Sequence, residues 1–199
     1  MLPDQGLVLG FDTSAAHCAA ALLRGNVLLA ARFEERARGQ AERLMPLLEE
    51  ILEEAGVTWS DLDAIGVGVG PGNFTGIRIA VSAARGLALG LGIPAVGISG
   101  FDARAATGSL AAVPAPRAQV YAALPGEAPR LMPESEARDA ARSAGLSFAP
   151  EASPAGLAQR IAQLTATRFQ HCTTSPAPLY LRAADAAPAR DLPPQLIDG

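Results

Sequence analysis

The chain has 199 residues and a formal net charge of −4; 49% of its residues are hydrophobic and 18% are charged. This composition supplies enough apolar side chains for a folded core and excludes a disordered chain. All 16 basic residues are arginines, so the chain has no lysine for a Walker A phosphate loop or a Schiff base. The acidic balance also disfavours a protein that wraps nucleic acid by itself.

The two cysteines and the two histidines form two adjacent pairs, His17-Cys18 and His171-Cys172. Two cysteines do not make a disulfide framework, and adjacent ligands are a poor zinc pattern, so we expect no metal site. The N-terminus lacks the basic and apolar regions of a signal peptide. No uninterrupted apolar run approaches the roughly 20 residues of a membrane span. We therefore expect a reduced, cytoplasmic protein without a membrane segment.

The two halves of the chain differ in composition. Residues 1–100 hold 15 of the 20 glycines but only 4 of the 16 prolines. This break predicts a boundary near residues 100–115. We expect an N-terminal domain at 1–107 and a reduced C-terminal domain at 108–199.

The apolar patterns of the first half predict alternating strands and helices. In chain order we expect strands at 7–12, 18–23 and 27–33, a helix at 40–55, a strand at 64–69, a helix at 75–91, a strand at 95–98, and a helix capped by Ser99 that runs through Ala106. An antiparallel meander followed by α/β crossovers matches the ribonuclease-H-like mixed sheet of the actin-like ATPases. Another open α/β sheet is the alternative.

A glycine-rich turn joins the predicted strand 64–69 to the predicted helix 75–91. Gly70 and Gly72 lie in it, directly before the helix, where backbone N–H groups could bind an anion. The glycines do not fit a G-x-G-x-x-G register, and no acid stands about 20 residues further on. A tight turn with close helix packing is the simpler interpretation.

A second candidate phosphate loop follows the first predicted strand, at Asp12, Thr13 and Ser14. An acid and small hydroxyl residues at this place handle metal and phosphate in actin-like ATPases. Such loops usually need a glycine, because the backbone must approach the phosphate closely, and Ala15-Ala16 follow here. We interpret the two loops together as a vestigial nucleotide site.

The predicted helix 75–91 is apolar on two sides, so it is buried on two sides. One side packs on its own sheet, and the other needs a second surface. The pattern alone leaves two interpretations open: an interface to a partner protein, shared with helix 40–55, or ordinary core within the chain. The candidate interface residues are Leu44, Leu47, Leu48, Ile51, Leu52, Ile77, Val81, Ala84, Arg85 and Ala88.

Several motifs resemble the TsaB (YeaZ) family. The resemblance spans about residues 7–107 and returns at Pro178–Arg182. It is carried by Leu9-Gly10-Phe11-Asp12-Thr13-Ser14, Glu42-Arg43-Leu44-Met45-Pro46-Leu47, Trp59-Ser60-Asp61-Leu62-Asp63-Ala64-Ile65, Gly70-Pro71-Gly72-Asn73-Phe74-Thr75-Gly76-Ile77-Arg78, Gly86-Leu87-Ala88, Pro94-Ala95-Val96-Gly97-Ile98-Ser99 and Pro178-Leu179-Tyr180-Leu181-Arg182.

The resemblance implies a non-catalytic subunit in the synthesis of N6-threonylcarbamoyladenosine (t6A) in tRNA. Members of this family pair with the transferase TsaD through helices of the N-terminal domain, and the ATPase TsaE joins that pair. Alone, they form homodimers through the same surface. The resemblance thus implies tRNA contact only through the complex, no intrinsic cofactor, and ATP or ADP at the interface of the complex.

Two positions depart from related patterns. Where TsaD carries an H-x-x-x-H metal pair, this chain has Gly100 and Arg104, which are not ordinary metal ligands. Where many TsaB sequences have a histidine, this chain has Gln40. The alternative functions are an actin-like ATPase or sugar-kinase-type enzyme, which lacks a second phosphate loop here, and a metallopeptidase, which lacks an H-E-x-x-H motif.

Overall fold

The computed structural model describes residues 6–149 and 154–181. Its first layer is a five-stranded sheet in the order β3-β2-β1-β4-β5. The first three strands form an antiparallel meander, and β4 and β5 run parallel to β1. The bounds are β1 Leu7–Asp12, β2 His17–Arg24, β3 Val27–Glu35, β4 Ala64–Gly68 and β5 Ala95–Ile98. The predicted mixed sheet is confirmed.

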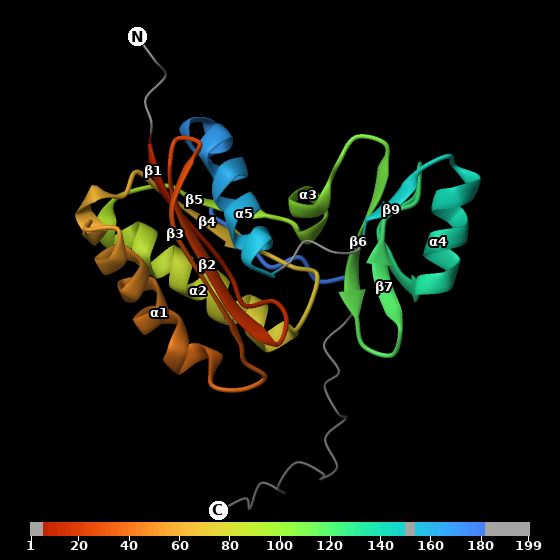
Figure 1. Cartoon of the computed structure of the whole chain (residues 1–199), viewed down its shortest axis with the longest axis horizontal. Helices are drawn as coiled ribbons and strands as arrows, with labels where there is room; N and C mark the ends of the chain where they lie inside the picture. The colour runs from red at the N-terminus through yellow and green to blue at the C-terminus, as the bar shows by residue number, and fades with distance from the viewer. Residues whose placement is uncertain (1–5, 150–153, 182–199) are drawn as a thin grey trace, which may run out of the picture.

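Helices cover both faces of this sheet (Figure 1). α1 (Gln40–Glu54) and α2 (Phe74–Leu91) lie on one face, and α5 (Pro154–Arg168) lies on the other. Strand β1 therefore reads as a continuous apolar run, since strands alternate their side chains between two faces and both are buried here. Leu9 and Phe11 pack with α1 and α2, whereas Val8 packs with α5.

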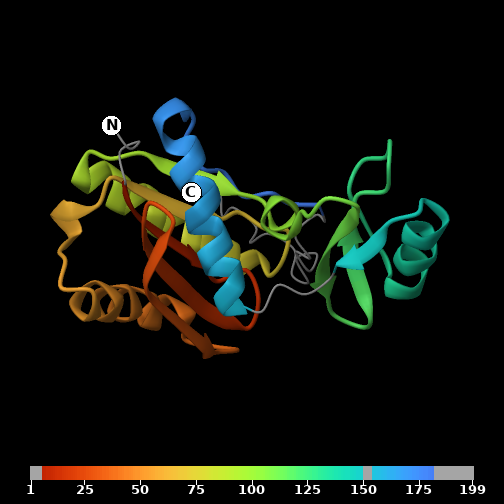
Figure 2. The same ribbon diagram turned by 45° about the horizontal axis from the view of Figure 1, so that its top comes forward.

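Two glycines of the sheet allow α5 to approach closely (Figure 2). A Cβ on Gly10 would lie 2.6 Å from the backbone nitrogen of Ala162, and a Cβ on Gly66 would lie 2.2 Å from Thr165 Oγ1. Real Cβ atoms do not approach other atoms so closely. The sequence requires glycine at these two strand positions because a helix backbone lies directly over them.

The helix ends follow ordinary capping rules. The side chain of Asn73 caps α2 by accepting a 2.9 Å hydrogen bond from Gly76 N, and Gly92 ends the helix at φ +69°. Ser99 caps α3 (Gly100–Arg104) as predicted, by accepting from Asp102 N. This helix ends at Arg104, two residues before the predicted end at Ala106. A short 3-10 helix, η1 (Trp59–Asp61), precedes β4.

A second, smaller sheet follows α3 in the chain and has the order β8-β7-β6-β9. α4 (Glu134–Ser143) packs on it through Ala137 and Ala141, which join Leu110, Val120 and Met132 in a separate small core. In Figure 1 this unit lies beside the first layer. The bounds are β6 Ser109–Ala115, β7 Gln119–Ala122, β8 Arg130–Pro133, α4 Glu134–Ser143 and β9 Ser147–Ala149.

The described elements do not divide along the chain as the two expected domains do. The second sheet begins at Ser109, but α5 returns to the first sheet and contacts β1, β2 and β4. After η2 (Phe169–His171), the chain continues along the first layer, where Leu179 N donates to Val69 O at 2.7 Å. The assignment of all of 108–199 to one C-terminal domain is therefore corrected. Sequence composition missed this return because α5 is alanine-rich and only weakly amphipathic.

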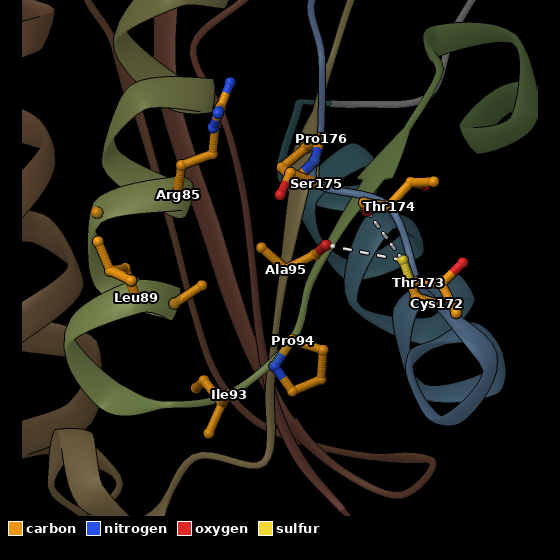
Figure 3. Close-up of a pocket in the computed structure, with 12 residues that line it drawn as sticks. Arg85, Leu89, Ile93, Pro94, Ala95, Cys172, Thr173, Thr174, Ser175 and Pro176 are labelled. Atoms are coloured by element: carbon orange, nitrogen blue, oxygen red, sulfur yellow. Dashed lines mark hydrogen bonds between the residues drawn. The ribbon is translucent and has the colours of Figure 1, made fainter.

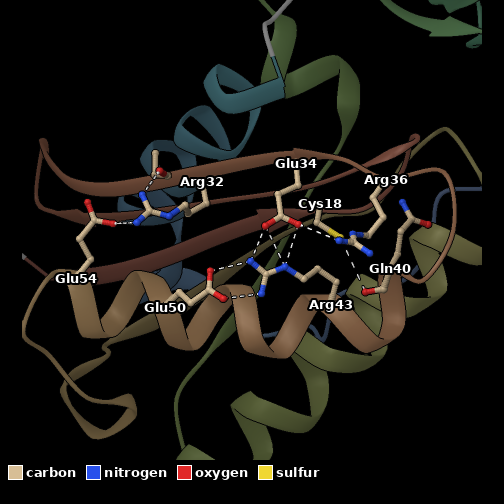
Figure 4. Close-up of polar contacts among 9 residues, drawn as sticks. Cys18, Arg32, Glu34, Arg36, Gln40, Arg43, Glu50 and Glu54 are labelled. Atoms are coloured by element: carbon tan, nitrogen blue, oxygen red, sulfur yellow. Dashed lines mark hydrogen bonds and ion pairs between the residues drawn. The ribbon is translucent and has the colours of Figure 1, made fainter.

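An ion-pair network holds α1 against the edge strand β3 (Figure 4). Arg43 Nε lies 2.9 Å from Glu34 Oε2 on β3, and Arg43 Nη2 lies 2.7 Å from Glu50 Oε2 on the same helix. Arg32 also pairs with Glu54. Hydrogen bonding to Arg43 lowers the pKa of Glu34. The network is mostly exposed, so it orients the helix more than it stabilises the fold.

Candidate functional site

The two predicted phosphate loops lie against each other. The loop after β1 contacts the glycine turn between β4 and α2. Asn73 N donates to Ser14 O at 2.6 Å, and Thr13 Oγ1 donates to Gly76 O at 2.7 Å. A Cβ on Gly72 would lie 2.3 Å from Ser14 O. The Ser14 carbonyl thus takes the Asn73 amide and packs against Gly72, so neither is open to an anion.

The glycines of the turn are required for packing and conformation. Gly70 has φ +95°, a value that favours glycine, and its peptide bond to Pro71 is cis. Its carbonyl accepts a 2.7 Å hydrogen bond from Gly100 N, which ties the turn to the end of β5. A Cβ on Gly76 would lie 1.9 Å from Thr13 O. These contacts favour the structural interpretation of the turn over a nucleotide cradle.

The carboxylate of Asp12 is buried, and one of its two oxygens is engaged by three neighbouring groups. Asp12 Oδ1 lies 2.8 Å from His17 Nε2 and accepts 2.9 Å hydrogen bonds from both N and Oγ of Ser14. Burial raises the pKa of this carboxyl, but the hydrogen bonds and charge of His17, together with Ser14, outweigh it and leave the pKa below its usual value. A Cβ on Gly68 would lie 1.8 Å from Asp12 Oδ2, so glycine is required there as well.

Gln40 is a site residue whose role the sequence did not reveal. It is buried at the first turn of α1, and its Nε2 donates to Ala15 O at 2.6 Å and His17 O at 2.8 Å, with Thr13 O at 3.3 Å. The available signal was a glutamine at the start of a predicted helix. A side-chain amide there can donate to the backbone carbonyls of a nearby loop. These hydrogen bonds attach the start of α1 to the loop between β1 and β2.

Gly100 and Arg104 lie at the carboxyl end of β5, and Arg104 Nη1 donates to Gly100 O at 3.1 Å. Burial lowers the pKa of Arg104, and the charge of Asp12 partly offsets this. Within residues 6–149 and 154–181, no group of three or more His, Cys, Asp or Glu side chains is arranged to hold a metal ion. The thiols of Cys18 and Cys172 instead point to backbone carbonyls.

The predicted partner interface needs a correction. Eight of its ten residues are core residues, each at most 3% exposed. They lie on α1 and α2 and face the five-stranded sheet. They are Leu44, Leu47, Leu48, Ile51, Leu52, Ile77, Val81 and Ala84. A stripe of period 3.6 shows that a face is buried but not by what, and here one sheet buries the stripes of both helices. Only Arg85 is exposed, and Ala88 is partly exposed.

The second apolar side of α2 is the part that remains accessible. Ile79, Ala83 and Leu87 are partly exposed, as is Met45 on α1. Among the described residues, α2 is also the one helix long and apolar enough to span a membrane by length and composition alone. The test is weak, because Ile77, Val81 and Ala84 bind this helix to the sheet.

The mixed sheet, with helices on both faces and a second small unit, defines the ribonuclease-H-like class of the actin-like ATPases. A family model described as "TsaD: tRNA N6-adenosine threonylcarbamoyltransferase" matches residues 34–170. The chain therefore belongs to this family.

Individual relatives confirm the resemblance to TsaB (YeaZ). The tRNA threonylcarbamoyladenosine biosynthesis protein TsaB of Escherichia coli K12 is 36% identical over 122 residues, covering 57% of this chain and 52% of that protein. A tRNA N6-adenosine threonylcarbamoyltransferase of Erythrobacter litoralis is 32% identical over 121 residues, covering 53% of this chain and 35% of the relative. The chain thus spans about half, or less, of the length of the curated relatives it matches.

A crystal structure from Pseudomonas aeruginosa, of a protein with similarity to peptidase YeaZ, superposes with a TM-score of 0.66 at 25% identity. The match covers 89% of this chain and 100% of that one. The agreement extends beyond the first 107 residues, where the sequence resemblance was concentrated. It supports one shared architecture for the sheet and the smaller second unit.

Proposed function

We propose that this chain is a non-catalytic subunit required for t6A synthesis in tRNA, and that it binds and supports the transferase TsaD together with TsaE. It would act in the cytoplasm and contact tRNA only through that complex. It would bind no nucleotide of its own, and any ATP or ADP would lie at the junction with the partner. The family membership and the TsaB relatives support this proposal.

The observation that carries the proposal is the contact between Ser14 and the start of α2. Ser14 O accepts from Asn73 N and occupies the space beside Gly72. An ATPase or kinase needs backbone amides free to bind phosphate at this place. Here Ser14 O takes the Asn73 amide, and the buried carboxylate of Asp12 is held by His17 and Ser14. These contacts favour a scaffold over an enzyme.

The surface that would receive TsaD is the accessible apolar side of α2, with Ile79, Ala83 and Leu87, beside Met45 of α1. This assignment replaces the buried stripe that the sequence suggested. Helix faces that keep apolar side chains partly exposed commonly serve protein interfaces. The alternative, an actin-like ATPase, gains no support from this surface.

Reconstituted t6A synthesis tests the proposal. TsaD and TsaE from the same organism, supplied with tRNA, ATP and threonylcarbamoyl-AMP, should form t6A only when this chain is present. Leu87→Glu should abolish both co-elution with TsaD and t6A formation. Val27→Glu, an exposed position on the distant β3 edge, is the matched control and should leave both unchanged. Formation of t6A at the same rate without the chain would overturn the proposal.

A further inference from the structure

A groove runs along the side of α2 that faces away from α1. In Figure 3 one wall is α2 with Arg85 and Leu89, the other wall is the extended segment 172–176, and Ala95 of β5 lies between them. This hollow has a volume of about 470 Å³. Pro176 closes its far wall by packing beside Gly97, where a Cβ would lie 3.3 Å from the proline Cβ. The groove is therefore a built feature of the fold.

A second hollow of about 320 Å³ continues the groove toward the start of α2. It is lined by Arg78, Ser82 and Arg85 on the helix and by Pro178 on the extended segment. Arg85 lines both hollows, so the two join beside its side chain. Arg78 is held at the outer end, 5.3 Å over the ring of Phe74.

The charge of the groove has one sign. Among the described residues that line the two hollows, Arg78 and Arg85 are charged and no residue is acidic. Within the described part of the chain, neither arginine forms an ion pair with a carboxylate. They stand seven residues apart on the helix, which places them about 10 Å apart along its axis. Neither charge is neutralised by a described carboxylate, so both arginines can pair with a ligand that carries two anionic groups at that spacing.

The other end of the groove is apolar. Leu89 is 86% exposed, and Ile93, Pro94 and Ala95 lie next to it. Leu89 is thus not isolated but continues an apolar lining, and contiguous exposed apolar surface is typical of a binding site. The groove thus combines an apolar anchor site with two spaced cations.

We infer that this groove binds a segment of a partner polypeptide that carries an apolar anchor side chain and two carboxylates about 10 Å apart. The apolar side chain enters the hollow beside Leu89, Ile93 and Pro94, and the carboxylates pair with Arg85 and Arg78. A nucleic acid fits less well, because two arginines and an apolar end provide few phosphate contacts on a chain of net charge −4.

This surface is distinct from the one in the proposed function. On the helical wheel, Arg78, Arg85 and Leu89 lie about 140° away from Ile79, Ala83 and Leu87. The groove also includes the extended segment 172–178, which the other surface does not. The inference goes beyond the proposed function, and the two can fail independently.

Fluorescence anisotropy with labelled peptides tests the inference on the full chain. The probes are short peptides with two glutamates two or four residues apart, spacings of about 7 and 13 Å that keep both side chains on one face of an extended chain, and a leucine or phenylalanine anchor placed at varied positions. The best of them should bind the Arg78→Glu/Arg85→Glu double variant about tenfold more weakly than the unaltered chain, because two partly exposed ion pairs are lost. Leu89→Ser should weaken it as well.

Two controls make the result specific. Arg24→Glu, a charge reversal at the exposed last residue of β2, should leave peptide binding unchanged, and a lysine version of the peptide should bind the double variant better than it binds the unaltered chain. The inference is overturned if glutamine peptides bind as well as glutamate peptides, if no peptide binds, or if an oligouridine of similar length binds more tightly. Co-elution of the double variant with TsaD, measured in parallel, reports on the proposed function separately.

Discussion

The hydroxyl of Thr13 donates a 2.7 Å hydrogen bond to the carbonyl oxygen of Gly76, and this bond joins the end of β1 to the first turn of α2. Thr13 is fully buried. The Thr13 hydroxyl, a candidate phosphate ligand in the sequence, instead donates to the backbone of α2. The contact between these two loops therefore depends on individual hydrogen bonds, and substitutions can test them one at a time.

Thr13→Val keeps the shape of the side chain and removes the hydroxyl donor. We expect the free energy of unfolding to fall by about 1 kcal/mol, because a buried hydrogen bond is lost and the Gly76 carbonyl keeps only its helical partner. Thr13→Ser retains the donor and should lose less. Urea unfolding of the three chains measures this, and a valine variant as stable as the original would contradict the role given to the hydroxyl.

Gly72→Ala should lower the free energy of unfolding by about 1–3 kcal/mol, since the new methyl group collides with Ser14 O. Gly86→Ala, inside α2, is the control. Its Cβ meets nothing within 4 Å, so it should stabilise α2 by about 0.5–1 kcal/mol. Thermal melts and ATP titrations are run together on both variants. A specific loss of ATP affinity in Gly72→Ala at unchanged stability would reverse the structural interpretation of the turn.

Gln40→Glu replaces the amide donor that clasps the loop by an acceptor. The carboxylate would face the carbonyl oxygens of Ala15 and His17, and we expect a loss of about 1–3 kcal/mol or more in unfolding free energy. Gln40→His keeps a ring N–H donor and should be milder. Equal stability of the glutamate and histidine variants would show that the clasp does not depend on hydrogen bonding.

Leu48→Ala should lower the free energy of unfolding by about 2–5 kcal/mol, because Leu48 is a core residue. The same substitution at Leu89, which is 86% exposed, should change it by no more than about 0.5 kcal/mol. Chemical denaturation of both variants checks the assignment. A Leu48→Ala variant of full stability that fails to bind TsaD would restore the interface that the apolar pattern suggested.

Asp12 should make stability depend on acid pH. Its folded pKa lies below the ordinary value of 3.8, so the unfolded chain takes up this proton first as the pH falls. Its contribution is complete above about pH 5 and is lost as the pH drops through the folded pKa. Asp12→Asn should flatten this part of the stability profile, as measured by denaturation between about pH 5 and pH 3. An unchanged slope in the variant would contradict the assignment.

Local patterns predicted the first layer well. The run at 7–12, the stripe at 40–55 and the Asn73 and Ser99 caps depend on nearest neighbours along the chain, and the structure confirms these elements. The return of α5 could not be predicted in the same way. It depends on Gly10 and Gly66, which leave room for α5. That role can be recognised only when the structure shows Ala162 and Thr165 lying over them.

The site was harder to predict for a related reason. The sequence identified Asp12, Thr13, Ser14, Gly70 and Gly72 as belonging together, and the structure brings the two loops into contact. The sequence could not show that the two loops hydrogen-bond to each other, or that Gln40 hydrogen-bonds to the loop after β1. For the apolar stripe with Leu48, the pattern left a partner interface and ordinary core both open, because periodicity shows burial without showing the covering surface. The residues left for a partner, such as Leu87, gave a weaker signal.

Size-exclusion chromatography with light scattering, on this chain alone and mixed with TsaD from the same organism, tests the proposed subunit role. We expect a heterocomplex that forms at the expense of any homodimer, is lost with Leu87→Glu, and persists with Val27→Glu. The subunit role would be contradicted if TsaD did not change the mass and elution volume of this chain at about 10 µM, a concentration at which micromolar affinity would be detected.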